Sequence, residues 1–227
     1  MGSRIPPLLE AYLRLPPEAS LVLLTGVLGS ITNWLVQRYL YSLLSSPTTT
    51  ARTPTSGGAR AAAPTDDASP GLGSGSPDDG VNVLLVSFLR DYAFWREGAG
   101  RLGLDLDAAA RKGRLVYVDG LDGLFSQSQS KPEPGPGPGG RRVLTTPTVD
   151  ALRAALEGAL AQLKARSSPG TGTGAGSRTV LILDQPDLLL AAAGHDVSAQ
   201  ALHEMLLDIR EVSLLQTRGR GATALPT

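Results

Sequence analysis

Four short apolar runs divide the chain, and each is followed by a turn and then by residues with a helical period. The runs are Ser20–Gly26, Val81–Leu89, Arg114–Asp119 and Thr179–Asp184. The second run is almost continuously apolar, which is typical of a strand covered on both faces in a parallel sheet. This alternation predicts an α/β fold with a mostly parallel sheet and flanking helices.

Helices are predicted between these runs. After Gly26, four apolar residues recur at intervals that can share one helix face, namely Trp34, Leu35, Tyr39 and Leu43. A second helix is predicted over Arg90–Glu97, where glycines end it soon afterwards, and a short helical turn over Leu104–Lys112.

Two longer amphipathic helices are predicted in the second half of the chain. Thr146 suits a helix cap, Pro147 suits the first turn, and Asp150 complements the helix dipole. The apolar stripe of this helix consists of Val149, Leu152, Leu156, Leu160 and Leu163. The last helix is predicted from about Ser198 to Val212.

Three segments have no apolar period, at about residues 45–80, 126–142 and 167–178. They are rich in Ser, Thr, Pro, Gly and Ala, so they bury too little apolar surface to offset the entropy of ordering them. We therefore expect one domain over residues 1–227 that carries three mobile insertions and a frayed tail at 217–227.

The composition argues against some classes of function and of binding site. The chain has 21 basic and 21 acidic residues, and this balance argues against autonomous binding to nucleic acid, which needs a clustered basic surface. It has no cysteine, which excludes disulfides and thiolate metal sites, and its two histidines are too few for a histidine-based metal site. No metal is expected.

The first run and its turn occupy the place of a phosphate-binding loop, where backbone N–H groups close on phosphates at a helix N-terminus. With Gly26 as the first glycine of G-x-x-x-x-G-K-[ST], Ile31, Thr32 and Asn33 replace the second glycine, the lysine and the hydroxyl residue. No other alignment restores the lysine, because the first lysine in the chain is Lys112. The loop is degenerate, and no nucleotide cofactor is expected.

Val180–Asp184, four apolar residues followed by an aspartate, matches the second half of a nucleotide site, in which the carboxylate holds magnesium. Aspartates at strand ends are also common turn caps. Without the lysine, Asp184 faces nothing that holds a triphosphate, so we expect neither a catalytic residue nor a metal site. The alternative is an active P-loop-type ATPase with a degenerate phosphate loop.

A membrane-anchored scaffold is a third possibility, because Ala19–Gln37 carries no charge and is about as long as a bilayer requires. Polar residues and glycines interrupt the run, and no basic cluster precedes it. A strand, a turn and a helix fit this stretch better, so no membrane partner is expected.

Two groups of residues are candidates for contacts with partners. Tyr92, Phe94 and Trp95 follow the second run closely, and one short helix cannot turn all of them toward its own core, so they are candidate interface residues. The alternative is that they pack on the sheet. Arg141 and Arg142, beside an insertion, are candidate RNA contacts, and a solvated pair is the alternative.

Four segments together resemble the Elongator complex protein 6 family in its filamentous-fungal form. They are Leu24–Leu35, Val86–Trp95, Lys112–Leu121 and Leu181–Leu190. The Ser-Phe-Leu-Arg-Asp segment before the aromatic pair is the most specific piece, and the Asp-Gln-Pro-Asp strand end is the next. The resemblance covers the ordered parts of nearly the whole chain.

The resemblance implies a RecA-like ATPase fold that has lost both nucleotide motifs and is paired with Elongator complex proteins 4 and 5. It implies that two copies of each alternate in a six-membered ring, which binds tRNA and assists the radical-SAM subunit that modifies wobble uridines. The expected function is thus assembly with the other Elongator subunits, in the cytoplasm and also in the nucleus, without catalysis.

The chain departs from the family at its end. A RecA-like sheet needs further strands after Asp184, one of them between the Asp184 strand and the Gly26 strand. Residues 218–227 provide at most a fragment of a strand. The resemblance therefore implies a truncated C-terminus or a wrong gene model.

Overall fold

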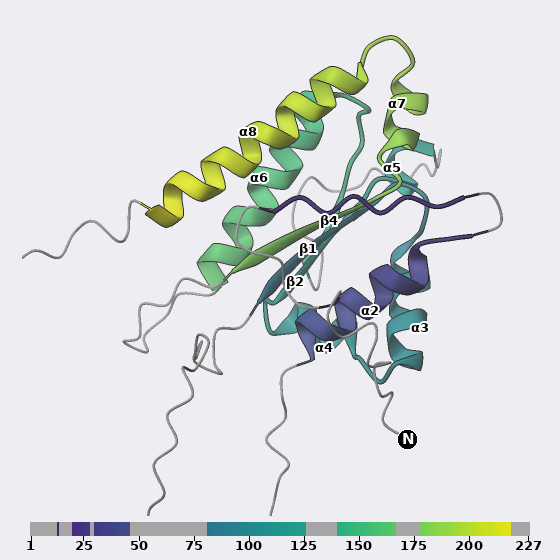
Figure 1. Ribbon diagram of the computed structural model, residues 1–227, viewed down its shortest axis with the longest axis vertical. Helices are drawn as coiled ribbons and strands as arrows, with labels where there is room; N and C mark the ends of the chain where they lie inside the picture. Colours follow the sequence, from purple (N-terminus) through teal and green to yellow (C-terminus); the bar gives the residue numbers. More distant parts are fainter. Residues whose placement is uncertain are drawn as a thin grey trace, which may run out of the picture.

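The computed structural model describes Leu13 and residues 20–27, 30–45, 81–125, 140–166 and 178–218, without the side chains of 166 and 212–218. Four parallel strands form one sheet in the order β3-β2-β1-β4. The strands are β1 (Asn82–Ser87), β2 (Leu115–Asp119), β3 (Arg141–Val143) and β4 (Thr179–Asp184). Helices lie on both sides of the sheet (Figure 1), which confirms the predicted α/β class.

Two apolar cores hold the helices to the sheet. On one face pack α2 (Asn33–Leu44), α3 (Tyr92–Arg101) and α4 (Leu106–Arg111). On the other pack α6 (Val149–Arg166), α7 (Asp187–Ala193) and α8 (Ala199–Arg218). A four-residue helix, α5 (Asp122–Phe125), follows β2. The central strands β1 and β2 are buried along their whole length, as the continuous apolar run predicted.

Most helices begin and end close to the predicted positions. α3 passes through Gly98 and Gly100 and ends just before Gly103, which takes a left-handed conformation with φ +84°. A glycine thus follows the helix as predicted, but the helix ends later than the predicted Glu97. α6 is capped by Thr148, whose Oγ1 accepts from Ala151 N at 3.2 Å. The predicted cap, Thr146, lies two residues too early.

The face of α2 differs from the prediction. Its buried residues are Asn33, Val36, Leu40, Leu43 and Leu44. Trp34, predicted to share the buried face, is 51% exposed. The spacing of 36, 40, 43 and 44 follows the helical period better than the predicted set.

The predicted strand over Ser20–Gly26 is wrong in the structure. Residues 20–27 are extended but belong to no strand, and Leu21, Leu23 and Val27 are 74%, 82% and 77% exposed. Of residues 20–27, only Leu24 packs against the apolar core on the α2, α3 and α4 face of the sheet. Val180 and Ile182 pack against the same core. The physical reason is the lack of a neighbour, because an extended segment becomes a strand only when another strand accepts its backbone hydrogen bonds.

Part of one predicted insertion is ordered. Arg141–Val143, placed in the insertion at 126–142, forms β3 and pairs with β2. α8 also continues to Arg218, into the predicted tail. The other residues predicted as insertions and tail, at 46–80, 126–139, 167–177 and 219–227, lie outside the described residues.

Candidate functional site: the carboxyl edge of the sheet

Polar side chains gather where the strands end. Ser87, Asp119 and Asp184 are the last residues of β1, β2 and β4, and in-register pairing brings them to one edge of the sheet. The chain runs from β1 to β2 and β3 on one side and then crosses to β4 on the other. Ser87 and Asp184 therefore lie at the topological switch point, where open α/β sheets bind their ligands.

Ser87 and Asp184 form a buried pair. The Ser87 hydroxyl donates to Asp184 Oδ2 at 2.8 Å and accepts from Arg90 N at 3.0 Å. Burial raises the pKa of the Asp184 carboxyl, while the Ser87 hydrogen bond and the charge of Arg90 lower it by less. The carboxyl thus already has a partner inside the chain.

The turn after Asp184 is unusual. Gln185 has φ +54°, a left-handed conformation that no other described non-glycine residue adopts. The turn leads through Pro186 into α7. Arg90, whose charge acts on Asp184, places its guanidinium 5.0 Å from the centre of the Phe94 ring.

Asp119 is held more tightly still. Its side chain is fully buried and accepts from the backbone N–H groups of Leu121 and Asp122 at 3.0 and 2.9 Å. Arg141 NH2 donates to it at 2.6 Å and also bonds Asp122 at 3.2 Å. Burial alone lowers the pKa of Arg141, but its bond to Asp119 and the nearby carboxylates raise it overall. Asp119 therefore anchors β3 to β2.

The degenerate phosphate-loop positions do not form a cradle with this edge. Gly26 and Ile31 are exposed, Thr32 makes no side-chain cap, and Asn33 is buried as the first residue of α2. α2 does begin at the end of the molecule where the strands finish (Figure 1). The helix thus follows the apolar segment as predicted, but that segment is not a strand that would hold the phosphate-loop positions at the edge of the sheet.

The aromatic candidates are mostly core residues. Trp95 is fully buried and meets Phe94 edge-on, with ring centres 5.3 Å apart. Tyr92 is half-buried, packs 5.2 Å from Tyr117 and donates to Asp107 at 2.8 Å. Trp95 therefore packs in the core of this chain, which favours the alternative prediction, and the interface role of the three aromatic residues stays a prediction.

The two arginines of β3 point to different partners. Arg142 NH2 donates to Gly158 O at 3.0 Å and to Gln162 at 3.3 Å, both on α6. Arg141 bonds the two aspartates at the carboxyl edge. Both arginines are partly buried and have partners within the chain, and their role as RNA contacts stays a prediction.

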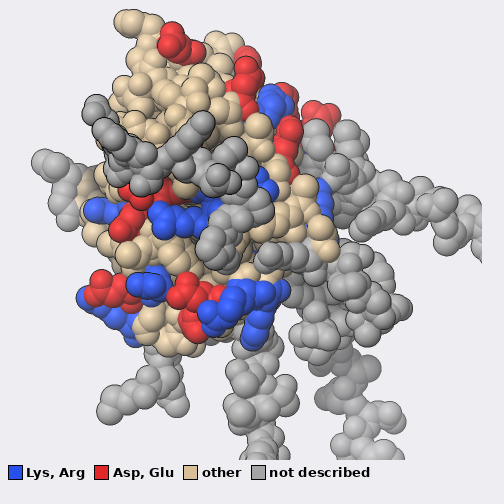
Figure 2. All heavy atoms as spheres, turned by 180° about the vertical axis from the view of Figure 1, so that it is seen from behind, with Lys and Arg blue, Asp and Glu red and all other residues tan. Residues whose placement is uncertain are grey.

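Charges on the visible surface are mixed. Figure 2 shows basic and acidic side chains interspersed over one face of the molecule. Ion pairs of α3 and of α4 with its N-cap are Arg101–Glu97 at 2.6 Å and Arg111–Asp105 at 3.7 Å. Among the described residues visible on this face, the two signs alternate, unlike the clustered basic surfaces that bind nucleic acids.

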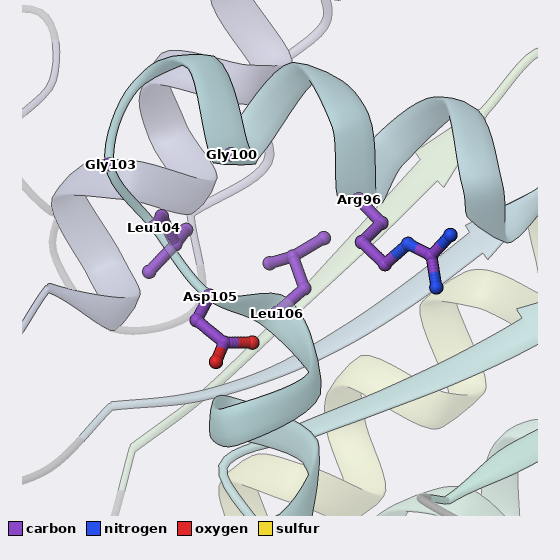
Figure 3. Close-up of a pocket in the computed structure, with 6 residues that line it drawn as sticks. All are labelled: Arg96, Gly100, Gly103, Leu104, Asp105 and Leu106. Carbon is purple, nitrogen blue, oxygen red and sulfur yellow. The ribbon is translucent and has the colours of Figure 1, made fainter.

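A hollow of 310 Å³ lies elsewhere, between the end of α3 and the start of α4. Figure 3 shows Leu104, Asp105 and Leu106 on one side of it and Gly100 on the other, with the end of Arg96 directed away. Since α3 runs back from the carboxyl edge, the hollow is remote from Ser87 and Asp184.

Sequence reasoning missed the partners of the two strand-end aspartates. Ser87 was part of a specific motif, and its place at the end of β1 was the available signal. The Arg141–Asp119 pair spans 22 residues, so no local pattern predicts it.

The described residues contain no group of three or more His, Asp and Glu side chains that could hold a metal ion. Among the helices in the described ranges, none is long and apolar enough to cross a membrane. No protein-family model, no curated protein and no solved structure matches this chain.

Proposed function

We propose that this chain is a non-catalytic, RecA-like subunit that acts by assembly with Elongator complex proteins 4 and 5. In this proposal the assembled ring binds tRNA and supports wobble-uridine modification in the cytoplasm and nucleus. The observation that carries it is an exposed apolar stretch. Six of the exposed large hydrophobic side chains fall within 14 positions, namely Leu21, Val22, Leu23, Val27, Ile31 and Trp34.

Such a surface needs a partner. No charged residue occurs from Ser20 to Gln37, so no charge in this stretch favours its exposure to water. Contiguous exposed apolar residues on soluble proteins mark sites of association. Their position beside the sheet fits an assembly subunit.

The carboxyl edge supports the non-catalytic part of the proposal. Asp119 is bonded to Arg141, and Asp184 is bonded to Ser87, so each carboxylate already has a partner within the chain. The phosphate-loop positions supply no lysine. A triphosphate with its magnesium ion would have to break these pairs without gaining a cation from the loop.

The alternative, an active ATPase, gains some support from Asp184 at the switch point. Binding of ATP to the isolated subunit, measured by titration calorimetry with and without magnesium, tests both functions. We expect no stoichiometric binding. Magnesium-dependent binding that disappears in Asp184→Ala would overturn the non-catalytic proposal.

Co-expression with Elongator complex proteins 4 and 5 tests the assembly itself. The expected result is co-purification of the three proteins in equal amounts. Recovery of this chain alone, while proteins 4 and 5 associate with each other, would contradict the proposal.

A further inference from the structure

The loop between β3 and α6, residues 144–148, contains three threonines, two of which differ sharply in their contacts. Thr148 is partly buried, and its hydroxyl caps α6 by accepting from Ala151 N at 3.2 Å. Thr146 is exposed, and its hydroxyl makes no hydrogen bond within the described part of the chain. The cap that the sequence assigned to Thr146 is thus made by Thr148, and the Thr146 hydroxyl is left without a structural contact.

Pro147 explains why Thr146 stays outside the helix. A proline disfavours the helical conformation of the residue before it, because its ring clashes with the N–H and Cβ of that residue. α6 accordingly begins at Val149, and Thr146 O accepts from Thr148 N at 2.9 Å in the turn that leads into it. The Thr146 hydroxyl therefore lies on a short segment that is neither helix nor strand.

The loop is held at its start and exposed at its middle. Leu144 is buried, and its N–H donates to Asp119 O at 2.8 Å, which fixes the start of the loop at the carboxyl edge of the sheet. Thr145 and Thr146 follow, and both are exposed. The native chain thus presents Thr146 to solvent while β3 and α6 stay in place.

Thr146–Pro147 is a dipeptide of the kind that proline-directed protein kinases modify. Such enzymes act on a hydroxyl whose next residue has the fixed φ and the missing N–H of proline. The chain has six Ser-Pro or Thr-Pro dipeptides, and Thr146–Pro147 is the one that lies within the described ranges. Thr145 is equally exposed but precedes a threonine, so it provides an internal comparison.

We propose that Thr146 is a phosphorylation site for a proline-directed Ser/Thr kinase, with ATP as the phosphoryl donor. The Thr146 Oγ1 forms a bond to the γ-phosphorus of ATP, and the bond from that phosphorus to the leaving ADP breaks. The hydroxyl proton passes to the kinase. This site does not depend on assembly with other subunits, because the surface of the single chain carries it.

The folded chain accommodates the phosphate. A phosphothreonine adds about −1.5 to −2 charges at pH 7. The phosphate would lie close to the N-terminus of the 18-residue helix α6, whose partial positive charge favours an anion. Asp150, in the first turn, opposes this charge, but it is exposed and therefore screened by water and salt. We expect modification without unfolding.

The full chain is incubated with magnesium, ATP and a purified proline-directed kinase of the mitogen-activated class, and the modified residues are located by peptide mass spectrometry. We expect phosphate on Thr146 and none on Thr145. Thr146→Val and Thr145→Val are matched variants, because each removes one hydroxyl from neighbouring exposed positions. The first should lose the phosphate from this loop and the second should keep it. Phosphate that is found only at other positions of the chain would overturn the proposal.

Pro147→Ala tests the contribution of the proline. It should lower the rate of Thr146 modification by about tenfold or more, because it removes the recognised residue and lets the helix extend back to Thr146. An unchanged rate would overturn the assignment to a proline-directed kinase.

A destabilised variant separates modification of the native chain from modification of an unfolded one. Leu85→Ala, far from the loop in sequence, truncates a fully buried side chain of β1. If the kinase acts on the folded chain, the rate at Thr146 should stay within about twofold of wild type, because the unfolded population does not limit it. A rise of about a hundredfold, in proportion to the unfolded population, would show that Thr146 is reached only after unfolding and would overturn the proposal. Loss of the native circular dichroism spectrum on modification would overturn it as well.

Discussion

β1 and β4 are adjacent parallel strands of six residues with similar sequences, NVLLVS and TVLILD, but their surroundings differ. β1 has a strand on each side and is buried at every position, whereas β4 pairs with one strand among the described residues and is buried only at Asp184. Apolar composition alone therefore does not determine burial. What decides it is whether the strand has neighbours on both edges.

The largest loss of stability is expected from a truncation in the core that packs on β1. Trp95 is fully buried in the core that also contains residues of α2 and β1. Trp95→Ala should therefore lower the free energy of unfolding by about 3–5 kcal/mol. Chemical denaturation of the isolated chain measures this. A variant that unfolds like wild type but no longer assembles would restore Trp95 as an interface anchor.

A matched pair of truncations compares the two strands directly. Leu85 and Ile182 are register partners, but Leu85 is fully buried and Ile182 only partly. We expect Leu85→Ala to cost about 3 kcal/mol and Ile182→Ala about 1 kcal/mol, because the second leaves a smaller dry cavity. Equal losses in urea denaturation would show that the β4 edge is covered in solution.

The ion pair at the carboxyl edge gives the next comparison. Arg141→Leu leaves the fully buried Asp119 without its cation and should cost about 2 kcal/mol, less than a completely buried pair because Arg141 is 41% exposed. Arg142→Leu, which loses only bonds to neutral groups on α6, should cost about 1 kcal/mol or less. Thermal melts at low salt separate the two, and equal losses would contradict the buried-charge explanation.

Asp184→Asn should stabilise the chain at neutral pH, since burial raises the pKa of the Asp184 carboxyl and the amide oxygen still accepts from Ser87. The unfolded carboxyl titrates near 3.8 and the folded one at higher pH, so between these values the native state binds more protons. The free energy of unfolding of wild type therefore falls as pH rises through this window and is level above it.

The variant lacks this fall, so its advantage should vanish below about pH 4. Urea denaturation at pH 3.5, 5 and 7 measures the difference. An Asp184→Asn chain that is less stable than wild type at pH 7 would show that the carboxylate is stabilised by its surroundings.

The smallest change in stability is expected at an exposed residue outside the core. Leu23 is 82% exposed, so Leu23→Ser should change the free energy of unfolding of the isolated chain by less than about 0.5 kcal/mol. The same change should lower self-association in light scattering, because it interrupts the apolar stretch. A loss of stability above 1 kcal/mol would show that residues 20–27 pack in solution.

The sequence predicted those strands that have at least one partner in the sheet and an apolar run of their own. β1, β2 and β4 appear almost where the apolar runs place them, because each run has a sheet partner. Ser20–Gly26 has an equally apolar pattern and no partner, so the same reasoning failed there. β3 was missed because its three residues include two arginines, which pair with Asp119 and with α6 through contacts that no local pattern reveals.

The position of the candidate site could be predicted in part. Asp184 was identified from the apolar run before it, and its place at the strand end is confirmed. Its bond to Ser87 was not predictable from spacing, since 97 residues separate the two. For Trp95 the sequence left packing on the sheet and an interface both open, because helix geometry gives the angle between neighbouring side chains but not how deeply each is buried.

The strand order also governs when the sheet forms during synthesis. Val83 pairs with Leu115 and with Val180, so one side of β1 is covered early and the other only after nearly the whole described domain has been made. Closing such distant parallel contacts costs loop entropy before any burial repays it, which makes folding slow. Until β4 arrives, the nascent chain carries β1 as a bare edge, and this interval is when a chaperone has most to protect.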